Sequence, residues 1–516
     1  MAATKELVLG IDASTTACKA IVWSLQGEAL AEGRASLPLL KPRPLWHEQP
    51  ADAWWQATRT AIRAALRQLR APIEQIRGLC IAPQRETFVP VDEQGKPLRP
   101  AIIWMDERCR ALLPEIASTY GAARLHAETG KPLSGNLTLG KIAWLRKHQP
   151  EVFARTARYL DVAAFLIHRL TGAYHTGWGC VDPTGLFDMQ ADTWCTPLLD
   201  TLGVTPEQFP RAFPPGAVTG TLHQRAAEAC GLWPGLPVIA GVGDGQAGGL
   251  GVGITEPGEA YLNLGTAVVS GTYSARYLTD RAFRTMYGGI PGSYSLETVL
   301  LSGTYIVTWF LDYFAAEGGE DPAEMLARFD TALDEIPIGA EGLLLVPYWN
   351  GALSPYWDAD ASGIAVGWRG IHTPEHLYRA ILEGIAFEQR LHSEGVEAAL
   401  DTPMTRFVAM GGGSRNERWC QIIADVTGKP VARAATPEAA ALGAGILSAA
   451  GAGLFPDVQR AAQAMTHIEP RTFLPDPGRQ ARYTALYEEV YRQLFPALRP
   501  YLDRLTALAE AQRVEL

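Results

Sequence analysis

The sequence predicts an α/β protein built from two related halves. Short apolar runs typical of buried strands alternate with helical patterns along all 516 residues, and this alternation is characteristic of α/β architectures. The segment 7–23 has the pattern strand, small polar turn, strand, and 259–273 repeats it much later in the chain. Because a chain of this length exceeds one ordinary core, we expect two domains, 1–252 and 253–516, divided within the glycine-bearing run 251–258.

Composition excludes several classes of protein. With 47% apolar and 19% charged residues, the chain resembles an ordinary globular protein. Its net charge of -10 argues against a nucleic-acid partner, although glycine-loop amides can still bind an anionic substrate. No apolar run is long enough to span a membrane. The first residues lack the apolar core of a signal peptide, and seven scattered cysteines suit a reducing compartment, so we expect a cytoplasmic protein.

In the first half, strands and turns place polar residues at strand ends. The strand 7–11 ends at Asp12, and strands at 20–23 and 29–37 follow. Apolar residues at helical spacing predict a helix over 50–69. A further buried strand, 76–81, runs into the polar sequence Gln84-Arg85-Glu86-Thr87.

The second half carries its clearest signals in helices. Thr373 and Pro374 are typical of the N-cap and the first position of a helix, which we expect over 373–391. The strand 407–410 runs into a glycine turn and a helix over 418–427, an arrangement that presents backbone amides to a nucleotide. Two further helices are expected at 438–449, where Gly443 and Gly445 permit close packing, and at 483–509, which would cross between domains, form a homodimer contact or cover a sheet.

One carboxylate stands out in the stretch 238–253, VIAGVGDGQAGGLGVG. Glycines surround Asp244 and allow a ligand or another backbone to come close. An isolated acid on such a turn can act as a general base on a hydroxyl. The alternative is a polar turn residue that caps a helix.

Four turns that follow strands, at Asp12, Asp244, Gly265 and Gly411, together suggest a cleft that holds a nucleoside triphosphate, although none matches the Walker pattern. Asp12 would hold Mg²⁺ through water, since Mg²⁺ keeps much of its hydration. Hydroxyl and amide donors and one lysine charge would contact phosphate oxygens; these are Thr15, Thr16, Lys19, Gly265 and Thr266.

These residues carry a resemblance to the FGGY carbohydrate kinase family over essentially the whole chain. The matching motifs are GIDASTT (10–16), PQRET (83–87), IIWMDER (102–108), GDGQAGGLG (243–251), LNLGTA (262–267), EGLLLVPYWNG (341–351) and GGGSRNERWCQIIAD (411–425). The resemblance implies two ribonuclease-H-like domains, similar to actin and hexokinase, around a central cleft. It also implies ATP, Mg²⁺ and phosphorylation of a sugar or polyol hydroxyl, with sugar bound by residues 1–252 and nucleotide by 253–516.

Carried over by position, the resemblance also implies roles for individual residues. Asp244 is the expected catalytic base and, with Asp12, an expected metal ligand. The expected nucleotide-binding residues are Asp12, Ser14, Thr15, Thr16, Lys19, Gly265, Thr266, Gly412, Gly413 and Asn416. The expected substrate-binding residues are Arg85, Glu86, Trp104, Asp106, Asn136, Asp244 and Gln246.

The substrate pocket combines features of two groups within the family. Residues 84–87 resemble glycerol kinases, whereas 166–253 and 341–425 are closer to xylulose kinases. We expect a ketopentose such as xylulose as substrate, with glycerol or another short polyol as the alternative. A non-enzymatic actin-like nucleotide switch or sugar sensor is the rival from another class, and Asp244 beside a polar pocket favours the enzyme.

Several of these residues also have ordinary structural interpretations. Arg85 and Glu86 are adjacent and would point to opposite faces of a regular strand, so both reach a ligand only if the strand has ended; otherwise they form a surface ion pair. Trp104 and Asp106 either share a pocket wall or are a packed ring and a solvated acid. Lys19 could equally be a solvated residue at the end of a strand.

Overall fold

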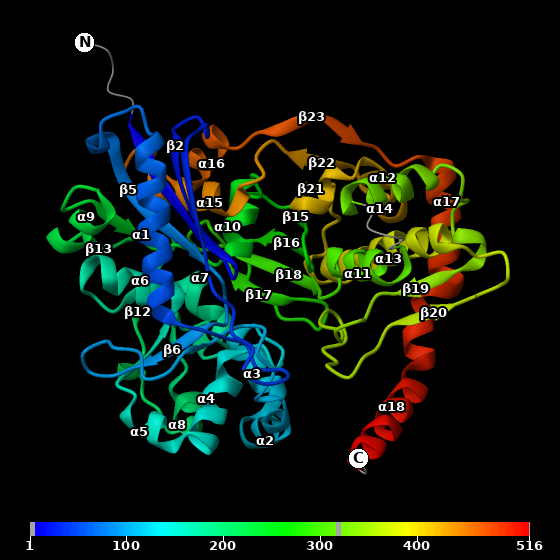
Figure 1. The fold of residues 1–516 in the computed structure, drawn as a ribbon, viewed down its shortest axis with the longest axis horizontal. Helices are drawn as coiled ribbons and strands as arrows, with labels where there is room; N and C mark the ends of the chain where they lie inside the picture. Colours follow the sequence, from blue (N-terminus) through cyan, green and yellow to red (C-terminus); the bar gives the residue numbers. More distant parts are fainter. Residues whose placement is uncertain (1–5, 316–320, 515–516) are drawn as a thin grey trace.

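The centre of the computed structural model, which describes residues 6–315 and 321–514, is a pair of twisted sheets with matching connectivity (Figure 1). The first sheet has the order β13-β14-β5-β1-β2-β3. Its strands are β1 (Leu7–Ala13), β2 (Ala17–Ser24), β3 (Ala29–Ser36), β5 (Ile76–Pro83), β13 (Val218–Thr221) and β14 (Pro237–Ile239). β2 pairs antiparallel with both β1 and β3, and β5 pairs parallel with both β1 and β14.

The second sheet repeats this pairing. Its order is β17-β18-β16-β15-β21-β22-β23. Its strands are β15 (Glu259–Leu264), β16 (Val268–Ser274), β17 (Arg284–Tyr287), β18 (Tyr294–Leu300), β21 (Arg406–Met410), β22 (Val431–Ala434) and β23 (Ile468–Phe473). β15, β16 and β18 pair antiparallel, and β15, β21 and β22 run parallel. The two strand-turn-strand segments recognised in the sequence therefore open two sheets that share a core of the same topology, to which the second sheet adds the edge strand β17.

We call residues 6–252 the N-terminal unit and the described residues from 253 onward the C-terminal unit. The helices of the N-terminal unit are α1 (Ala51–Gln68), α2 (Leu113–Ile116), α3 (Ala122–Thr129), α4 (Thr138–His148), α5 (Pro150–Arg155), α6 (Val162–Thr171), α7 (Trp178–Val181), α8 (Thr196–Leu202), α9 (Gln224–Cys230) and α10 (Asp244–Gly251). Those of the C-terminal unit are α11 (Thr304–Phe310), α12 (Pro322–Ala332), α13 (Pro374–Leu400), α14 (Glu417–Thr427), α15 (Ala439–Gly451), α16 (Val458–Met465), α17 (Pro477–Leu486) and α18 (Arg492–Val514).

Helix α15 belongs to the C-terminal unit by sequence but packs against the first sheet, where its apolar residues share a core with Val8, Ile21 and Trp23. Its glycine allows an unusually close approach to α10, because a Cβ on Gly443 would lie 1.9 Å from the carbonyl oxygen of Ala247. The expectation that glycines in 438–449 permit close packing is confirmed. The contact fixes α10, and with it Asp244, between the two sheets.

A smaller layer lies beyond the first sheet. Strands β4 (Glu48–Gln49), β7 (Ala101–Ile102), β6 (Phe88–Val91) and β8 (Arg158–Asp161) form a four-stranded sheet in that order. Figure 1 shows this layer with α2, α4, α5 and α8 in the lower left part of the molecule. The remaining short strands pair as β9 (His175–Gly177) with β12 (Arg211–Phe213), β10 (Phe187–Asp188) with β11 (Thr193–Trp194), and β19 (Leu344–Val346) with β20 (Ile364–Val366).

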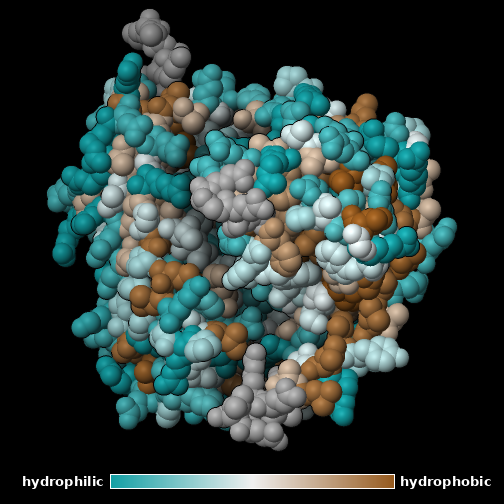
Figure 2. Space-filling view, turned by 45° about the vertical axis from the view of Figure 1, so that its right-hand side comes forward, coloured by the Kyte–Doolittle hydropathy of each residue, from teal (hydrophilic) through white to brown (hydrophobic). Residues whose placement is uncertain are grey.

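The last helices cover the C-terminal unit and end away from it. Figure 1 shows α17 beside α13 and α14, and α18 running down past β20 to the C-terminus. Phe495, near the start of α18, is buried, whereas Tyr501 and Leu505 are exposed. Apolar surface is most extensive on the right-hand side of Figure 2, where the C-terminal unit comes forward. None of the helices in the described ranges is long and apolar enough to cross a membrane.

Local structure differs from the sequence-based prediction at α10 and α13. The predicted glycine turn at Asp244 is the first turn of α10. The helix expected over 373–391 continues to Leu400. In each case tertiary packing supplies order that glycine content or a short apolar pattern does not indicate.

Candidate active site

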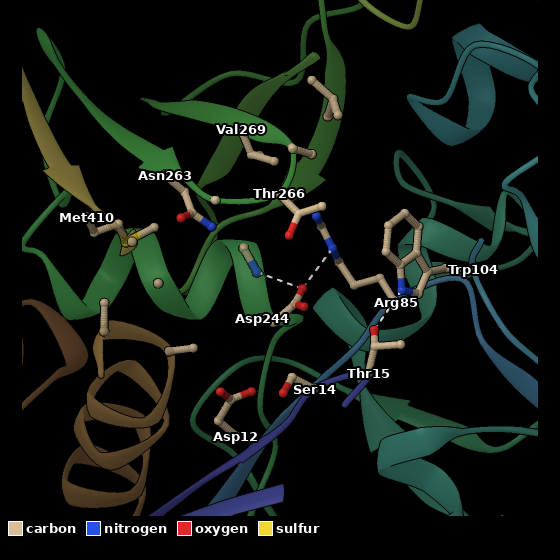
Figure 3. A pocket seen from close by; sticks show the side chains of 18 of the residues that line it. Asp12, Ser14, Thr15, Arg85, Trp104, Asp244, Asn263, Thr266, Val269 and Met410 are labelled. Carbon is tan, nitrogen blue, oxygen red and sulfur yellow. Dashed lines mark hydrogen bonds and ion pairs between the residues drawn. The ribbon is translucent and has the colours of Figure 1, made fainter. Parts of the chain in front are cut away.

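A cavity of about 360 Å³ lies between the two units, and residues from both of them line it. Figure 3 shows Asp244 and Arg85 in its middle, with Trp104 and Thr15 to one side and Asn263 and Met410 to the other. Small-molecule sites are commonly concave spaces of this size with a few convergent polar groups. The candidate site is therefore at the junction of the two sheets.

Asp244 is the first residue of α10 and faces the cavity. Its side chain is 36% exposed, and its Oδ1 lies 3.1 Å from Nε of Arg85 and accepts a hydrogen bond of 2.8 Å from the amide of Gly245. Burial raises the pKa of the Asp244 carboxyl above its ordinary value, and the Arg85 guanidinium opposes that rise. A carboxylate that is accessible and made more basic by its surroundings is suited to accept a proton from a hydroxyl.

Arg85 and Glu86 follow the end of β5, so both reach the cavity despite being adjacent. Glu86 has a left-handed backbone, with φ of 52°, which turns the chain out of the strand. Two hydrogen bonds to the carbonyl oxygen of Glu86 stabilise this turn. The hydroxyl of Thr138 donates at 3.2 Å and the ammonium of Lys141 at 3.0 Å.

Another part of the cavity wall joins the turn after β1 to residues Trp104 and Asn136, which follow β7 in the chain. The indole N–H of Trp104 donates to the hydroxyl oxygen of Thr15 at 2.8 Å, and Nδ2 of Asn136 donates to the carbonyl oxygen of Trp104 at 3.2 Å. All three residues line the cavity. They form an amphipathic surface, with an aromatic ring and fixed polar groups, which is common in sites for small molecules.

Asp12, at the end of β1, faces the cavity from the side of α15. Its Oδ1 is buried and has no hydrogen-bond partner, and burial together with the nearby Asp244 raises its pKa to about 7. An unpartnered buried carboxylate oxygen is costly unless a cation or donor completes it. The residue therefore fits a Mg²⁺ ion that arrives with a nucleotide. Lys19 lies nearby with its ammonium 2.5 Å from Oε2 of Glu438.

The side of the cavity toward the second sheet is made by turns at the ends of its strands. Gly265 and Thr266 follow β15, and Gly411 follows β21. Gly411 has φ of 82°, and a Cβ there would lie 2.4 Å from Oδ1 of Asn263. Only glycine fits this position, and it brings the backbone of the turn against the cavity. Apolar residues complete this end, namely Val269, Val299, Leu301, Leu353 and Met410.

The structure brings together most, but not all, of the residues expected from the sequence. Asp12, Ser14, Thr15, Lys19, Arg85, Glu86, Trp104, Asn136, Asp244, Gly265 and Thr266 line the cavity. Gln246 lies behind the wall, where its Nε2 donates to the carbonyl oxygen of Gly179. Thr16 is exposed and does not line the cavity.

Asp106 and the last glycine-turn residues also lie off the cavity. Asp106 is fully buried and accepts hydrogen bonds from Arg108 and from the amide of His47. Gly412 and Gly413 are next to Gly411 in the turn but outside the lining. Asn416 caps α14 by accepting from the amide of Trp419, and its Nδ2 donates to Asp330.

Three lining residues with polar side chains escaped the sequence analysis as site residues. Asn263 lies inside the LNLGTA motif, which could have indicated it. Glu438 stands at the start of an Ala-rich helix, and Arg284 lies on the edge strand β17. No local motif marks Glu438 or Arg284, because only the fold brings them to the cavity.

The site and fold together define a class of protein. Two sheets of the same topology enclose a cavity with a basic carboxylate, a second acid suited to Mg²⁺, and glycine turns at strand ends. These are the parts that a phosphoryl-transfer enzyme needs to position a nucleotide and activate an acceptor hydroxyl.

Comparison with known proteins supports that class. Residues 7–251 match the model of the FGGY family of carbohydrate kinases, N-terminal domain, and residues 260–452 match that of its C-terminal domain. The chain is 30% identical to a xylulose kinase of Escherichia coli, over 96% of this chain and 100% of the relative. It is 26% identical to a gluconokinase of Bacillus subtilis, over 85% of this chain and 86% of the relative.

A similar structure is the crystal structure of xylulose kinase from Rhodospirillum rubrum, with a TM-score of 0.88 and 29% identity, covering 96% of this chain and 100% of that one. The chain belongs to the FGGY family of carbohydrate kinases. It therefore has the two-domain actin- and hexokinase-like fold expected from the sequence, and it is an ATP-dependent sugar phosphotransferase. The interpretation as a non-enzymatic nucleotide switch is set aside.

Proposed function

We propose that this enzyme phosphorylates a primary hydroxyl of a ketopentose such as xylulose, with Asp244 as the general base. The observation that carries the proposal is the half-exposed Asp244 carboxylate, which faces a cavity lined by both units and has a raised pKa. In this proposal Asp244 accepts the proton of the sugar hydroxyl while that oxygen attacks the γ-phosphorus of ATP in line. The bond between the γ-phosphorus and the bridging oxygen breaks, and ADP leaves. Removal of the proton makes the oxygen a better nucleophile without a covalent enzyme intermediate.

The other residues have positioning roles in this proposal. Arg85, Glu86, Trp104 and Asn136 bind the sugar on the side of the N-terminal unit. The turns at Ser14–Thr15, Gly265–Thr266 and Gly411 face the phosphates, and the adjoining Gly412, Gly413 and Asn416 face the adenosine. When bound with ATP near Asp12, Mg²⁺ neutralises phosphate charge.

The charge balance of the cavity favours a neutral sugar over an acidic one. In the described part of the chain, each cationic side chain that lines the cavity is paired with a carboxylate: Lys19 with Glu438, Arg85 with Asp244 and Glu297, and Arg284 with Glu86 and Glu297. An aldonic acid would need a cation that is not already neutralised. This distinguishes the proposed substrate from gluconate, on which one of the relatives acts by its name.

The test is initial-rate ADP production with Mg-ATP across D- and L-xylulose, D- and L-ribulose, xylitol, ribitol, arabitol, erythritol, glycerol and gluconate. We expect one ketopentose to raise the rate of ADP production above the sugar-free rate by much more than any other compound in the panel. Glycerol or erythritol as the best substrate would mean that Arg85 and Glu86 define a short-polyol site instead. Gluconate as the best substrate would contradict the charge argument, and a panel without stimulation would contradict the proposed substrate class.

We also propose that the enzyme is a homodimer through the end of α18. Tyr501, Leu505 and Leu508 are exposed and share one face of that helix at helical spacing. Sedimentation equilibrium should give twice the mass of 55.9 kDa for the wild type and a monomer for Leu505→Arg. A monomeric wild type at micromolar concentration would rule the dimer out.

A further inference from the structure

Part of the sugar side of the cavity is held by the C-terminal unit. Strands β17 and β18 lie at the edge of the second sheet, and they carry Arg284 and Glu297. These two residues pair directly with Arg85 and Glu86 from the end of β5 in the N-terminal unit. The adjacent pair that the sequence assigns to the substrate is therefore engaged across the junction of the two units.

Glu297 is the centre of this cross-unit network. Its Oε2 accepts from Nη1 of Arg85 at 2.8 Å and from the hydroxyl of Tyr261 at 2.8 Å. Its Oε1 accepts from Nε of Arg284 at 2.8 Å. The Glu297 side chain is fully buried, and the two guanidinium groups lower its pKa to about 2 despite that burial. Its carboxylate is thus a fixed negative charge that orients both arginines.

Arg284 completes the network on the other side. Its Nη1 donates to Oε1 of Glu86 at 2.6 Å, and its own side chain is only 9% exposed. Glu86 has the left-handed φ of 52°, a conformation that a non-glycine residue keeps only where its surroundings enforce it. Arg284, from the C-terminal unit, holds the side chain of Glu86 and so helps to keep this backbone conformation.

The N-terminal unit in turn fixes strand β17, on which Arg284 lies. The amide of Thr285 donates to the carbonyl oxygen of Gly130 at 2.9 Å, and the amide of Tyr287 donates to Oδ2 of Asp182 at 2.6 Å. An edge strand usually leaves such amides unpaired. Here they bond to Gly130 and Asp182, and so attach β17 to the N-terminal unit.

Arg85 passes this constraint to the reacting group. Its guanidinium joins Glu297 through Nη1 and approaches Asp244 through Nε, at 3.1 Å. When one edge of a planar guanidinium is hydrogen-bonded to a carboxylate, its other N–H groups point in a fixed direction. The position of Arg85 beside Asp244 is therefore set by a residue that does not line the cavity.

We propose that Glu297 is a positioning residue for phosphorylation, which sets Arg85 against Asp244 and, through Arg284, fixes Glu86 at the sugar. The inference rests on the proposed function, because it assumes that these residues meet the sugar. It implies that the sugar site is complete only when the two units are together. A sugar bound to the N-terminal unit alone would face an arginine without its orienting partner.

The test compares Glu297→Gln with a matched control, Glu383→Gln. Glu383 is also buried, and it also accepts from an arginine and a tyrosine, Arg379 at 2.7 Å and Tyr483 at 2.8 Å, but it lies outside the cavity lining. For each variant kcat and both KM values are measured with the best sugar of the panel. Hydrogen exchange of residues 83–87 is measured in the sugar-free protein. Glu297→Asp, which keeps the charge but shortens its reach, serves if the glutamine variant does not fold.

We expect Glu297→Gln to lower kcat on the order of 10²-fold, since misplacement of a positioned group by about 1 Å has such an effect, with the KM for Mg-ATP unchanged. Residues 83–87 should exchange faster than in Glu383→Gln, which should retain wild-type kcat and KM. Wild-type kinetics in Glu297→Gln, or an equal loss of kcat in both variants, would overturn the proposal. If no sugar is phosphorylated by the wild type, the proposed function fails on its own. In that case hydrogen exchange of residues 83–87 tests the positioning role. Faster exchange in Glu297→Gln but not in Glu383→Gln supports the role, and equal exchange in the two variants overturns it.

Discussion

Nε of Arg85 and Oδ1 of Asp244 lie 3.1 Å apart, although the two residues belong to different elements, the end of β5 and the start of α10. The contact places a permanent positive charge beside the expected base. It opposes the effect of burial, which raises the pKa of the Asp244 carboxyl above its ordinary value. The carboxyl therefore combines access to the cavity with a raised pKa, a combination that a fully solvated acid would not have.

Replacement of Asp244 by Asn tests the base directly. The amide cannot accept the proton of the hydroxyl, so we expect kcat to fall on the order of 10²- to 10⁴-fold. Initial-rate ADP production measures the loss, and thermal unfolding of the variant serves as the control for its integrity. A turnover close to that of the wild type would exclude Asp244 as the base.

Replacement of Asp12 by Asn tests the metal site. Because Oδ1 of Asp12 is buried without a partner, loss of its charge should raise the Mg²⁺ concentration needed for half-maximal rate at fixed ATP. The matched control is Asp52→Asn, an exposed carboxylate on α1 paired with Arg169. Identical Mg²⁺ titrations for both variants would remove Asp12 from the metal site.

Asp106 should behave as a structural residue. It is fully buried and holds Arg108 through both carboxylate oxygens, so Asp106→Asn leaves part of a buried charge uncompensated. Removal of one partner of such a pair costs roughly 3–5 kcal/mol of folding free energy. Chemical denaturation should show this loss while the KM for the sugar stays near the wild-type value; a raised KM without loss of stability would return Asp106 to the pocket.

Gly443→Ala tests the contact between α15 and α10. The added Cβ would lie 1.9 Å from the carbonyl oxygen of Ala247, so the helices must separate, at a cost of about 1–3 kcal/mol. Because Asp244 begins α10, kcat should also fall. Gly370→Ala is the control, since a Cβ there has no neighbour within 4 Å, and equal stability of the two variants would contradict the packing argument.

Glu388 predicts a pH dependence of stability far from the cavity. Burial raises its pKa to about 7 from 4.5, although Tyr348 and Tyr491 donate to it. Between these two pH values the folded state keeps a proton that the unfolded state releases, so stability falls as the pH rises through this window. The wild type should lose on the order of 3 kcal/mol relative to Glu388→Gln between pH 4.5 and 8. Parallel denaturation curves for the two proteins at all pH values would contradict the raised pKa.

The sequence by itself determined the fold class, the two repeated strand-turn-strand segments and most of the polar side chains that line the cavity. Those features are local: a strand end, a glycine and a polar residue stand next to each other in the chain, as in the turns at Asp12, Gly265 and Asp244. The sequence also indicated that Arg85 and Glu86 could share a site if the strand had ended, and β5 does end at Pro83, before the left-handed Glu86.

Only the tertiary structure decided which charges meet. Arg284 and Glu297 lie on strands with no motif of their own. They reach Glu86 and Arg85 because β17 and β18 of the second sheet lie against the residues that follow β5 of the first. Asp106 turns inward because Arg108 and the amide of His47 take its carboxylate. Pairing energies between charges depend on distance and burial, and neither quantity is written in the spacing of residues along a chain.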